Sequence, residues 1–439
     1  GFSHTHLSGT GCSDYGDVLL MPGTDKISFD PLVYGSPFNH ATEKSSPGYY
    51  SVTLNDNKIK CEMTSSTRVG VQKYNYPSLY TPSILLDLMH RDKVLGSSIK
   101  IVNDHTIEGY RHSEAWAKDQ YVYFSMEFSQ PFAEIKMMGR TNPIKIGDSI
   151  VSDSIRIAFI FKKTDRITEI GKKTFLQIQT EARATWNKEL GRIAVYDSSQ
   201  RNMTNFYTSL YHMMIVPNVY SDVDGKYRGR DNKIHIAKGY TQYSVFSLWD
   251  TFRAAHPMYA LIDKKRSLDF IKTFLAQYEQ GGRLPVWELG ANETDCMIGY
   301  HSVSVIADAL AKDITGFNIP LAFEAAKKSA TWNHLGLPAF NANNYLQIDD
   351  ESESVSKTLE YAYDAWCVAQ IAKHLGKNDE ALYYNRLAYS YRNLYDPSTG
   401  FMRPRRNGNW LSPFDPLEVN NHYTEANSYQ YSFFVPFQV

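Results

Sequence analysis

Hydrophobic and polar residues alternate over short stretches in the first third of the chain. The clearest runs are Tyr49–Leu54, Gln120–Met126 and Ser154–Phe161, and clusters of Asn, Asp, Gly and Pro punctuate the segments around them. Many short strands with frequent turns are typical of two packed antiparallel sheets. The pattern therefore predicts a β-sandwich domain over residues 1–165.

The apolar period changes to a helical one in the segment 174–190. Its apolar stripe consists of Phe175, Ile178, Ala182 and Trp186. Residues at this spacing share one face of a helix, and Gly191 is suited to end it. We predict a helical linker over residues 166–199, between the sandwich and the rest of the chain.

From residue 200 onward the pattern is helical, and residues 200–439 are expected to form a second, mainly helical domain. The helix predicted over Thr358–Leu375 ends at Gly376, and a second helix, capped by Asn378 or Asp379, follows at once. No unit of this kind recurs at a fixed period, which argues against a solenoid. Unequal helical hairpins separated by long loops favour a closed α/α toroid with a pocket at one end.

Composition narrows the class of protein. The 439 residues are 43 % hydrophobic and 21 % charged, with a net charge of −1, so a globular protein without affinity for nucleic acid is expected. No apolar run has the length of a membrane span. The aromatic content of 14 % suits either sugar binding or an aromatic core. The four cysteines are scattered without a Cys-x-x-Cys pair, which argues against a zinc site.

Residues Gly1–Asp17 combine glycines and hydroxyl side chains with two histidines. On a strand, His4 and His6 would share a face and could form a metal pair or a sugar-binding edge. Because isolated histidine pairs specify metals poorly, a structural histidine cluster in a glycine-rich loop is the alternative.

A second candidate segment is Ser247–Met258. Trp249 and Asp250 offer a stacking face beside a carboxylate, and a sugar needs both. The alternative is that Asp250 caps a helix that begins at Thr251.

A third candidate segment, Gly281–His301, is polar and has few lysines, which is typical of a pocket lining. Glu293 and His301 are its candidate binding residues. The alternative is an ordinary helix that starts at Thr294, with acidic residues at its positive end.

The fourth segment is Asn420–Gln430, which contains Glu425. On a helix Glu425 would share a face with Tyr429, and the aromatic ring would desolvate the carboxyl group as a general acid requires. A surface or capping glutamate is the alternative. Two acidic runs, at 349–353 and 222–231, lack the spacing of a calcium loop and are interpreted as solvated.

The four segments together, in this order, resemble glycoside hydrolase family 92. The resemblance rests on GFSHTHLSGTG at residues 1–11, Trp249-Asp250-Thr251, NETDCMIGYH at 292–301 and the Glu425 segment, and it spans nearly the whole chain. It implies an N-terminal β-sandwich followed by an (α/α)6 barrel. It also implies a calcium-dependent, inverting exo-α-mannosidase that removes terminal mannose from glycans, with a secreted, periplasmic or cell-surface location.

The resemblance also assigns roles to individual residues. Glu425 corresponds to the family's general acid, within EANSYQY where the family usually has EGNAWQY, so Asn427 and Gln430 are kept. Trp249 and Asp250 correspond to contacts with the terminal mannose. The resemblance places Glu293 and His301 in the pocket wall.

The main departure of this sequence from the family concerns the segment that carries the general base. Members end in a segment with Gly-Asn and paired acidic residues that supplies the base and helps to hold calcium, and this chain has no such segment. By the resemblance the chain is truncated at both ends, and its base and calcium ligands are unassigned. Another α/α-toroid glycosidase and a non-catalytic glycan-binding protein are the competing hypotheses, and calcium dependence and turnover distinguish them.

Overall fold

The computed structural model describes residues 1–8, 11, 14–163, 166–168 and 173–438. These residues form two compact units, Gly1–Ile215 and Val216–Val439. The first unit is mainly β and the second mainly α, which confirms the predicted change of structure along the chain. The boundaries expected at residues 165 and 199 stay a prediction.

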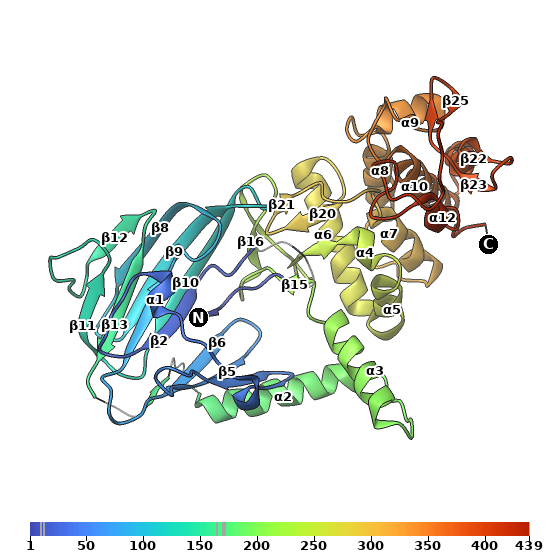
Figure 1. Cartoon of the computed structure of the whole chain (residues 1–439). Helices are drawn as coiled ribbons and strands as arrows, with labels where there is room; N and C mark the ends of the chain where they lie inside the picture. The colour runs from blue at the N-terminus through green and yellow to red at the C-terminus, as the bar shows by residue number, and fades with distance from the viewer. Residues whose placement is uncertain (9–10, 12–13, 164–165, 169–172, 439) are drawn as a thin grey trace. The chain divides into compact units, whose positions relative to one another are not determined.

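Three antiparallel sheets make up most of the first unit (Figure 1). The first sheet contains, in spatial order, β1 (Phe2–Ser3), β2 (Leu19–Gly23), β7 (Ser83–Asp87), β13 (Arg156–Phe161) and β11 (Phe132–Met137). The second contains β10 (Gln120–Glu127), β9 (Thr106–Glu114), β8 (Lys93–Ile101) and β12 (Ser149–Ser152). The third contains β14 (Arg166–Thr168), β6 (Gly70–Asn75), β5 (Lys60–Ser65), β4 (Tyr49–Thr53) and β3 (Lys44–Ser46).

The three strands expected from alternation are present as β4, β10 and β13. A single apolar core joins the sheets, with Leu86, Ile99, Ile107 and Phe159 fully buried in it. In β8, the alternate residues Ile99 and Ile101 enter this core, because successive side chains point to opposite faces. Short helical pieces lie between the strands at α1 (Pro31–Tyr34) and His40–Thr42.

The helix predicted over 174–190 is α2 (Phe175–Leu190). Thr174 and Gln177 form a capping box at its start, and Gly191 caps its end. Its predicted stripe packs on the third sheet, where Phe175 and Ile178 are buried with Val71. A second helix, α3 (Gln200–Met213), follows in the same unit.

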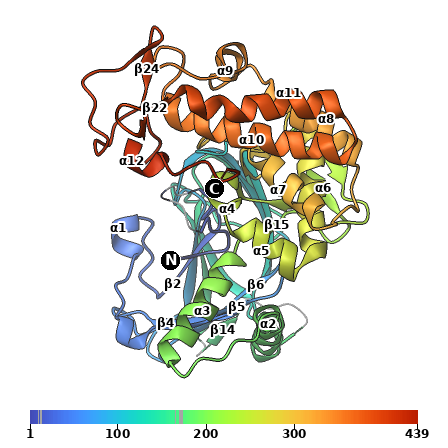
Figure 2. The same ribbon diagram turned by 90° about the vertical axis from the view of Figure 1, so that its right-hand side faces the viewer.

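The second unit is built around helix α10 (Ser354–His374), which lies beside α11 (Asn378–Ala388) as the predicted hairpin (Figure 2). The helix α10 also contacts α7 (Ser302–Ala311) and α8 (Ile319–Ala330). It begins four residues before the predicted start at Thr358. Lys377, rather than Asn378 or Asp379, is the N-cap residue of α11, and its side chain makes no capping bond.

Shorter elements complete the second unit. Its other helices are α4 (Leu248–Thr251), α5 (Ala255–Ile262), α6 (Lys264–Gly281), α9 (Leu337–Asn343), the 3-10 helix Tyr389–Asn393 and α12 (Ser428–Tyr431). Its strand pairs are β15 (Asn218–Val219) with β18 (Tyr243–Ser244), β16 (Lys226–Arg228) with β17 (Ile234–Ile236), β22 (Tyr395–Asp396) with β23 (Phe401–Met402), and β24 (Arg405–Arg406) with β25 (Asn409–Trp410). A three-stranded sheet consists of β19 (Phe246–Ser247), β20 (Trp287–Leu289) and β21 (Asn292–Glu293).

Candidate active site

Two carboxylates are buried one turn apart on α10. Glu360 and Asp364 are 0 % exposed, on a helix that is otherwise packed on several sides by apolar side chains. Burial of a charge is unfavourable unless other groups pair with it. The groups that contact these two carboxylates therefore determine whether the carboxylates are stable in the folded protein.

His301 lies between the two carboxylates. Its Nδ1 is 2.8 Å from Asp364 Oδ1, and its Nε2 is 2.9 Å from Glu360 Oε2. The Tyr300 backbone N–H donates to the other oxygen of Asp364 at 2.7 Å, and the Phe252 ring stacks on the imidazole with centroids 4.1 Å apart. The imidazole is therefore fixed in orientation and 1 % exposed.

The two carboxylates decide the charge of His301. Burial alone would lower its pKa, but the negative charges of Asp364 and Glu360 outweigh burial and raise the pKa to about 9. The imidazole therefore carries a proton at neutral pH. Burial raises the pKa of Asp364, against the opposing effects of His301 and the Tyr300 N–H.

Trp249 and Arg253 contact Glu360 from the side of α4. The indole N–H of Trp249 donates to Glu360 Oε1 at 3.1 Å, and Arg253 Nη2 is 3.3 Å from the same oxygen. The Arg253 guanidinium also lies over the Trp249 ring, 5.1 Å from its centroid. Two of the expected site residues, Trp249 and His301, therefore meet at Glu360.

Asp250 follows Trp249 in α4 and is exposed. It forms a hydrogen bond with the Ser247 hydroxyl. Ser247 is the N-cap residue of α4, so the alternative that Asp250 caps a helix starting at Thr251 is wrong. The expected sugar contact of Asp250 stays a prediction.

Glu293 binds backbone groups of its own hairpin. It accepts the N–H groups of Val286 at 2.9 Å, Trp287 at 2.8 Å and Asp295 at 3.2 Å. The alternative of an ordinary helix that starts at Thr294 is wrong, since the next helix, α7, begins at Ser302. These bonds shape the segment between β20 and α7, and the expected substrate contact of Glu293 stays a prediction.

The neighbouring Glu288 is a carboxyl group that the sequence interpretation did not single out as a site residue. Its side chain is 0 % exposed, and its Oε1 accepts the Ala291 N–H at 2.6 Å and the Ser244 hydroxyl at 3.1 Å. No hydrogen-bond partner lies within reach of its Oε2 among the described residues. Burial raises the pKa of Glu288 to about 7.

Glu425 lies in a turn before α12 with a left-handed backbone conformation, φ +52°. It is exposed, whereas Thr424 and Ser428 on either side are buried. Ser356 of α10 bonds both the Thr424 N–H, at 3.0 Å, and its hydroxyl, at 2.9 Å. The expectation that Glu425 shares a helix face with Tyr429 is wrong, because α12 begins only at Ser428.

Asn427 and Gln430 form a reciprocal capping box at the start of α12. The Asn427 side chain accepts the Gln430 N–H, and the Gln430 side chain accepts the Asn427 N–H, both at 3.1 Å. The Asn427 amide also donates to the Leu417 carbonyl at 3.1 Å. Both residues hold the turn that carries Glu425, and their direct contact with substrate stays a prediction.

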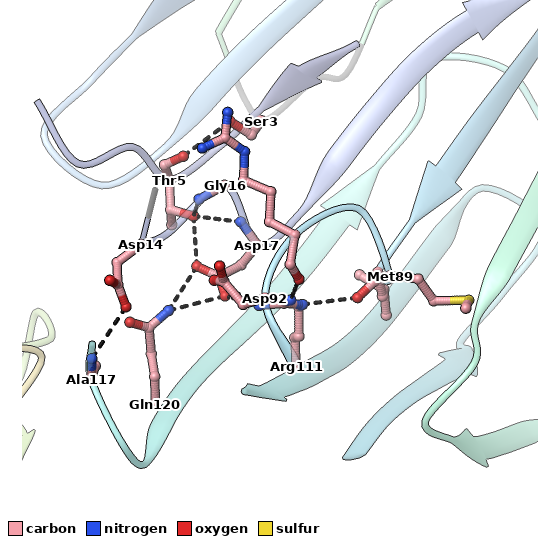
Figure 3. A network of polar contacts seen from close by, with 12 residues as sticks. Ser3, Thr5, Asp14, Gly16, Asp17, Met89, Asp92, Arg111, Ala117 and Gln120 are labelled. Atoms are coloured by element: carbon pink, nitrogen blue, oxygen red, sulfur yellow. Dashed lines mark hydrogen bonds and ion pairs between the residues drawn. The ribbon is translucent and has the colours of Figure 1, made fainter. Parts of the chain in front are cut away.

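In the first unit, the N-terminal segment is tied to the sheets through Asp17 (Figure 3). The Thr5 hydroxyl donates to Asp17 at 2.8 Å, Arg111 donates at 2.6 Å and Gln120 at 3.0 Å. This buried network was missed by the sequence interpretation, and nothing in the local pattern links residues so far apart along the chain.

The expected histidine pair does not lie on one strand, because β1 ends at Ser3. His4 contacts Gln72 at 2.9 Å, and burial lowers its pKa to about 4, whereas His6 is exposed. Residues 9, 10, 12 and 13 of the same segment lie outside the described part of the chain.

Within the described residues, no group of three or more His, Cys, Asp or Glu side chains could hold a metal ion. The acidic run 349–353 is engaged instead with cations. Asp349 is 3.3 Å from Arg406, and Glu351 is 2.8 Å from Lys357. The described residues therefore include no cluster of acidic side chains with the several oxygens that calcium prefers.

Two family profiles cover the chain between them. The glycosyl hydrolase family 92 N-terminal domain matches residues 1–172, and the family 92 catalytic domain matches residues 163–439. One curated relative, an uncharacterized secreted glycosidase from Arthroderma benhamiae, is 24 % identical over 99 % of this chain and 64 % of its own length.

Solved structures agree with these profiles. A family GH92 α-mannosidase from Bacteroides thetaiotaomicron, also described in complex with mannoimidazole, has a TM-score of 0.93 and 37 % identity over 99 % of this chain. A GH92 inverting mannosidase from the same organism has a TM-score of 0.87 and 28 % identity over 95 % of this chain. The chain spans 64 % and 61 % of their respective lengths.

These likenesses cover both units and confirm the expected fold class, a β-sandwich followed by a helical linker and an α/α toroid. No helix among the described residues has the length and apolar character to cross a bilayer. The chain belongs to glycosyl hydrolase family 92.

Proposed function

We propose that the protein is an exo-acting α-mannosidase that hydrolyses terminal α-linked mannose of glycans with inversion. The relatives described as family GH92 α-mannosidases support the activity, and the mannoimidazole complex of one of them supports a mannose-containing substrate. The curated relative named as a secreted glycosidase supports a secreted, periplasmic or cell-surface location.

The observation that carries the proposal is the placement of Glu425. Its exposed side chain lies on a turn whose backbone is held by α10 through Ser356 and by the capping box of α12, so this turn presents the carboxyl group to solvent. The same helix carries Glu360, which binds Trp249. Helix α10 therefore holds both the proposed acid and a proposed sugar contact.

In the proposed reaction, Glu425 donates its proton to the departing glycosidic oxygen. Trp249 contacts the terminal mannose with its ring, and Asp250 accepts hydrogen bonds from sugar hydroxyls. An inverting enzyme also needs a carboxylate base roughly 6.5–9.5 Å from the acid, with a water molecule between them.

Calcium dependence is proposed from the resemblance to the family. Bound calcium would supply a positive charge to sugar hydroxyls, through hard oxygen ligands. Because the described residues include no cluster of acidic side chains that could hold the ion, no step is assigned to it here.

The test is cleavage of α-mannobioses by the full-length protein and its Glu425→Gln variant. The variant keeps the size of the side chain and loses the acidic proton, so we expect kcat to fall about 10²–10⁴-fold. Because Glu425 is exposed, the thermal unfolding temperature should not change. Full activity in the variant would remove Glu425 from its role, and mannoside binding without turnover in the wild type would favour a glycan-binding protein.

A further inference from the structure

Glu360 takes no chemical step in the reaction proposed above, yet it is a fully buried carboxylate that binds the proposed sugar contact Trp249. It is 0 % exposed and faces three groups, Trp249, Arg253 and His301. Burying a carboxylate is unfavourable unless its partners are well placed. The fold therefore keeps a charge at this position at a cost in stability, which calls for a reason beyond packing.

One oxygen of Glu360 fixes the indole ring of Trp249. The hydrogen bond from the Trp249 N–H ends on a charged acceptor, and such bonds are stronger than those between neutral groups. Arg253 contacts the same oxygen and also lies over the Trp249 ring. The ring is thus held at its edge by an acceptor and on one face by a cation, while the side chain remains partly exposed.

The other oxygen of Glu360 is 2.9 Å from His301 Nε2, an ion-pair contact whose alignment is not that of a hydrogen bond. The opposite nitrogen of His301 binds Asp364. Asp364 and Glu360 are four residues apart on α10, so one helix carries both carboxylates that face His301. The protonated imidazole supplies a positive charge beside Glu360. The array runs from Asp364 through His301 and Glu360 to the indole of Trp249.

We propose that Glu360 is a positioning residue that fixes the Trp249 ring for contact with the terminal mannose, with His301 and Asp364 holding Glu360 in turn. This inference rests on the proposed function, in which Trp249 contacts that sugar. In this arrangement His301 affects substrate binding through Glu360 and does not contact the ligand directly.

A double-mutant cycle on the full-length protein tests the inference. Glu360→Gln removes the charge and keeps the shape, Trp249→Phe removes the indole N–H, and the two are combined. We expect Glu360→Gln to lower kcat/KM for an α-mannobiose about ten-fold or more, because it weakens a charge-assisted hydrogen bond. In the Trp249→Phe background the same change should lower kcat/KM less than about three-fold.

The control variant is Glu324→Gln. Glu324 also accepts a hydrogen bond from an aromatic side chain, the Tyr278 hydroxyl at 2.8 Å, but it lies on the surface outside the array. This variant should keep wild-type kcat/KM. Equal losses from Glu360→Gln in both backgrounds would show a purely structural effect and overturn the inference. Wild-type protein without mannosidase activity would contradict the proposed function instead.

A second measurement does not depend on the folding of the Glu360 variant. The indole N–H resonance of Trp249 is identified in NMR spectra as the one that is absent from Trp249→Phe. Because this N–H is bonded to a buried carboxylate, we expect it to exchange with deuterium slowly, although the side chain is partly exposed. Rapid exchange in the wild type would mean that Glu360 does not hold the ring, and it would overturn the inference.

Discussion

The buried carboxylates of the second unit differ in what each one contacts. Glu360 and Asp364 face a protonated histidine, whereas Glu288 accepts hydrogen bonds through its Oε1 alone among the described residues. Burial favours the neutral form of a carboxyl group, and it raises the pKa of both Asp364 and Glu288. The positive charge of His301 opposes this effect at Asp364, whereas hydrogen bonds from Ala291 and Ser244 oppose it at Glu288.

For Glu288 the folded pKa, about 7, lies above its ordinary value of 4.5. The folded state therefore holds the proton more tightly, and stability decreases as pH rises from 4.5 through 7. We expect Glu288→Gln to be more stable than the wild type above pH 7, by roughly 1–3 kcal/mol, and to lose this advantage near pH 4.5. Urea unfolding at several pH values measures it, and a pH-independent difference would contradict the assignment.

For His301 the folded pKa, about 9, lies above its ordinary value of 6.5. The stability that its charge contributes is fully present below 6.5 and is lost as pH rises through 9. The wild type should therefore lose on the order of 3 kcal/mol of unfolding free energy across this range, and His301→Gln should lack that loss. Parallel slopes for the two proteins would exclude a protonated His301.

At the scale of elements, α10 connects the candidate residues. Its Ser356 holds the turn of Glu425, and its Glu360 holds Trp249, one helical turn further along. Side chains four apart share a helix face, so both supports act on the same side of α10. The apolar spacing of the sequence predicted this helix. It did not predict the roles of the buried Ser356 and Glu360, because their partners, Thr424 and Trp249, are distant in the sequence.

Asn427 caps α12, and it is also an expected substrate contact. Substitutions at this position distinguish the two roles. Asn427→Ala removes the cap and should cost about 1 kcal/mol of stability and lower activity by displacing Glu425. Asn427→Ser restores a capping oxygen, so both properties should recover if capping is the main role of Asn427. Recovered stability with activity still lost would support the expected substrate contact instead. Thermal unfolding and mannobiose cleavage give the two readouts.

At the scale of the whole molecule, local pattern predicted the β-sandwich and the helical hairpin, because alternation and helical spacing are properties of neighbouring residues. It did not predict the Asp17 network or the partners of Glu360, since Asp17 and Arg111, and likewise Trp249 and Glu360, lie about a hundred residues apart. The individual segments at Trp249 and Glu425 became informative when taken together as a family resemblance.

Removal of calcium tests the whole protein rather than one site. Chelation with EGTA should abolish mannoside cleavage, and added calcium should restore it, because an ion bound through hard oxygen ligands is removed and replaced reversibly. Magnesium serves as the control, since it prefers a tighter octahedral site. Activity that survives chelation would favour a different α/α-toroid glycosidase.

The central claim is a single-displacement hydrolysis of terminal α-mannose. Proton NMR of an α-mannobiose digest, recorded before the released sugar equilibrates, tests it most directly. Inversion predicts that β-mannose appears first and that Glu425→Gln releases none at a comparable rate. Initial release of α-mannose would contradict the inverting mechanism, and no release of mannose by the full-length protein would contradict the proposed activity.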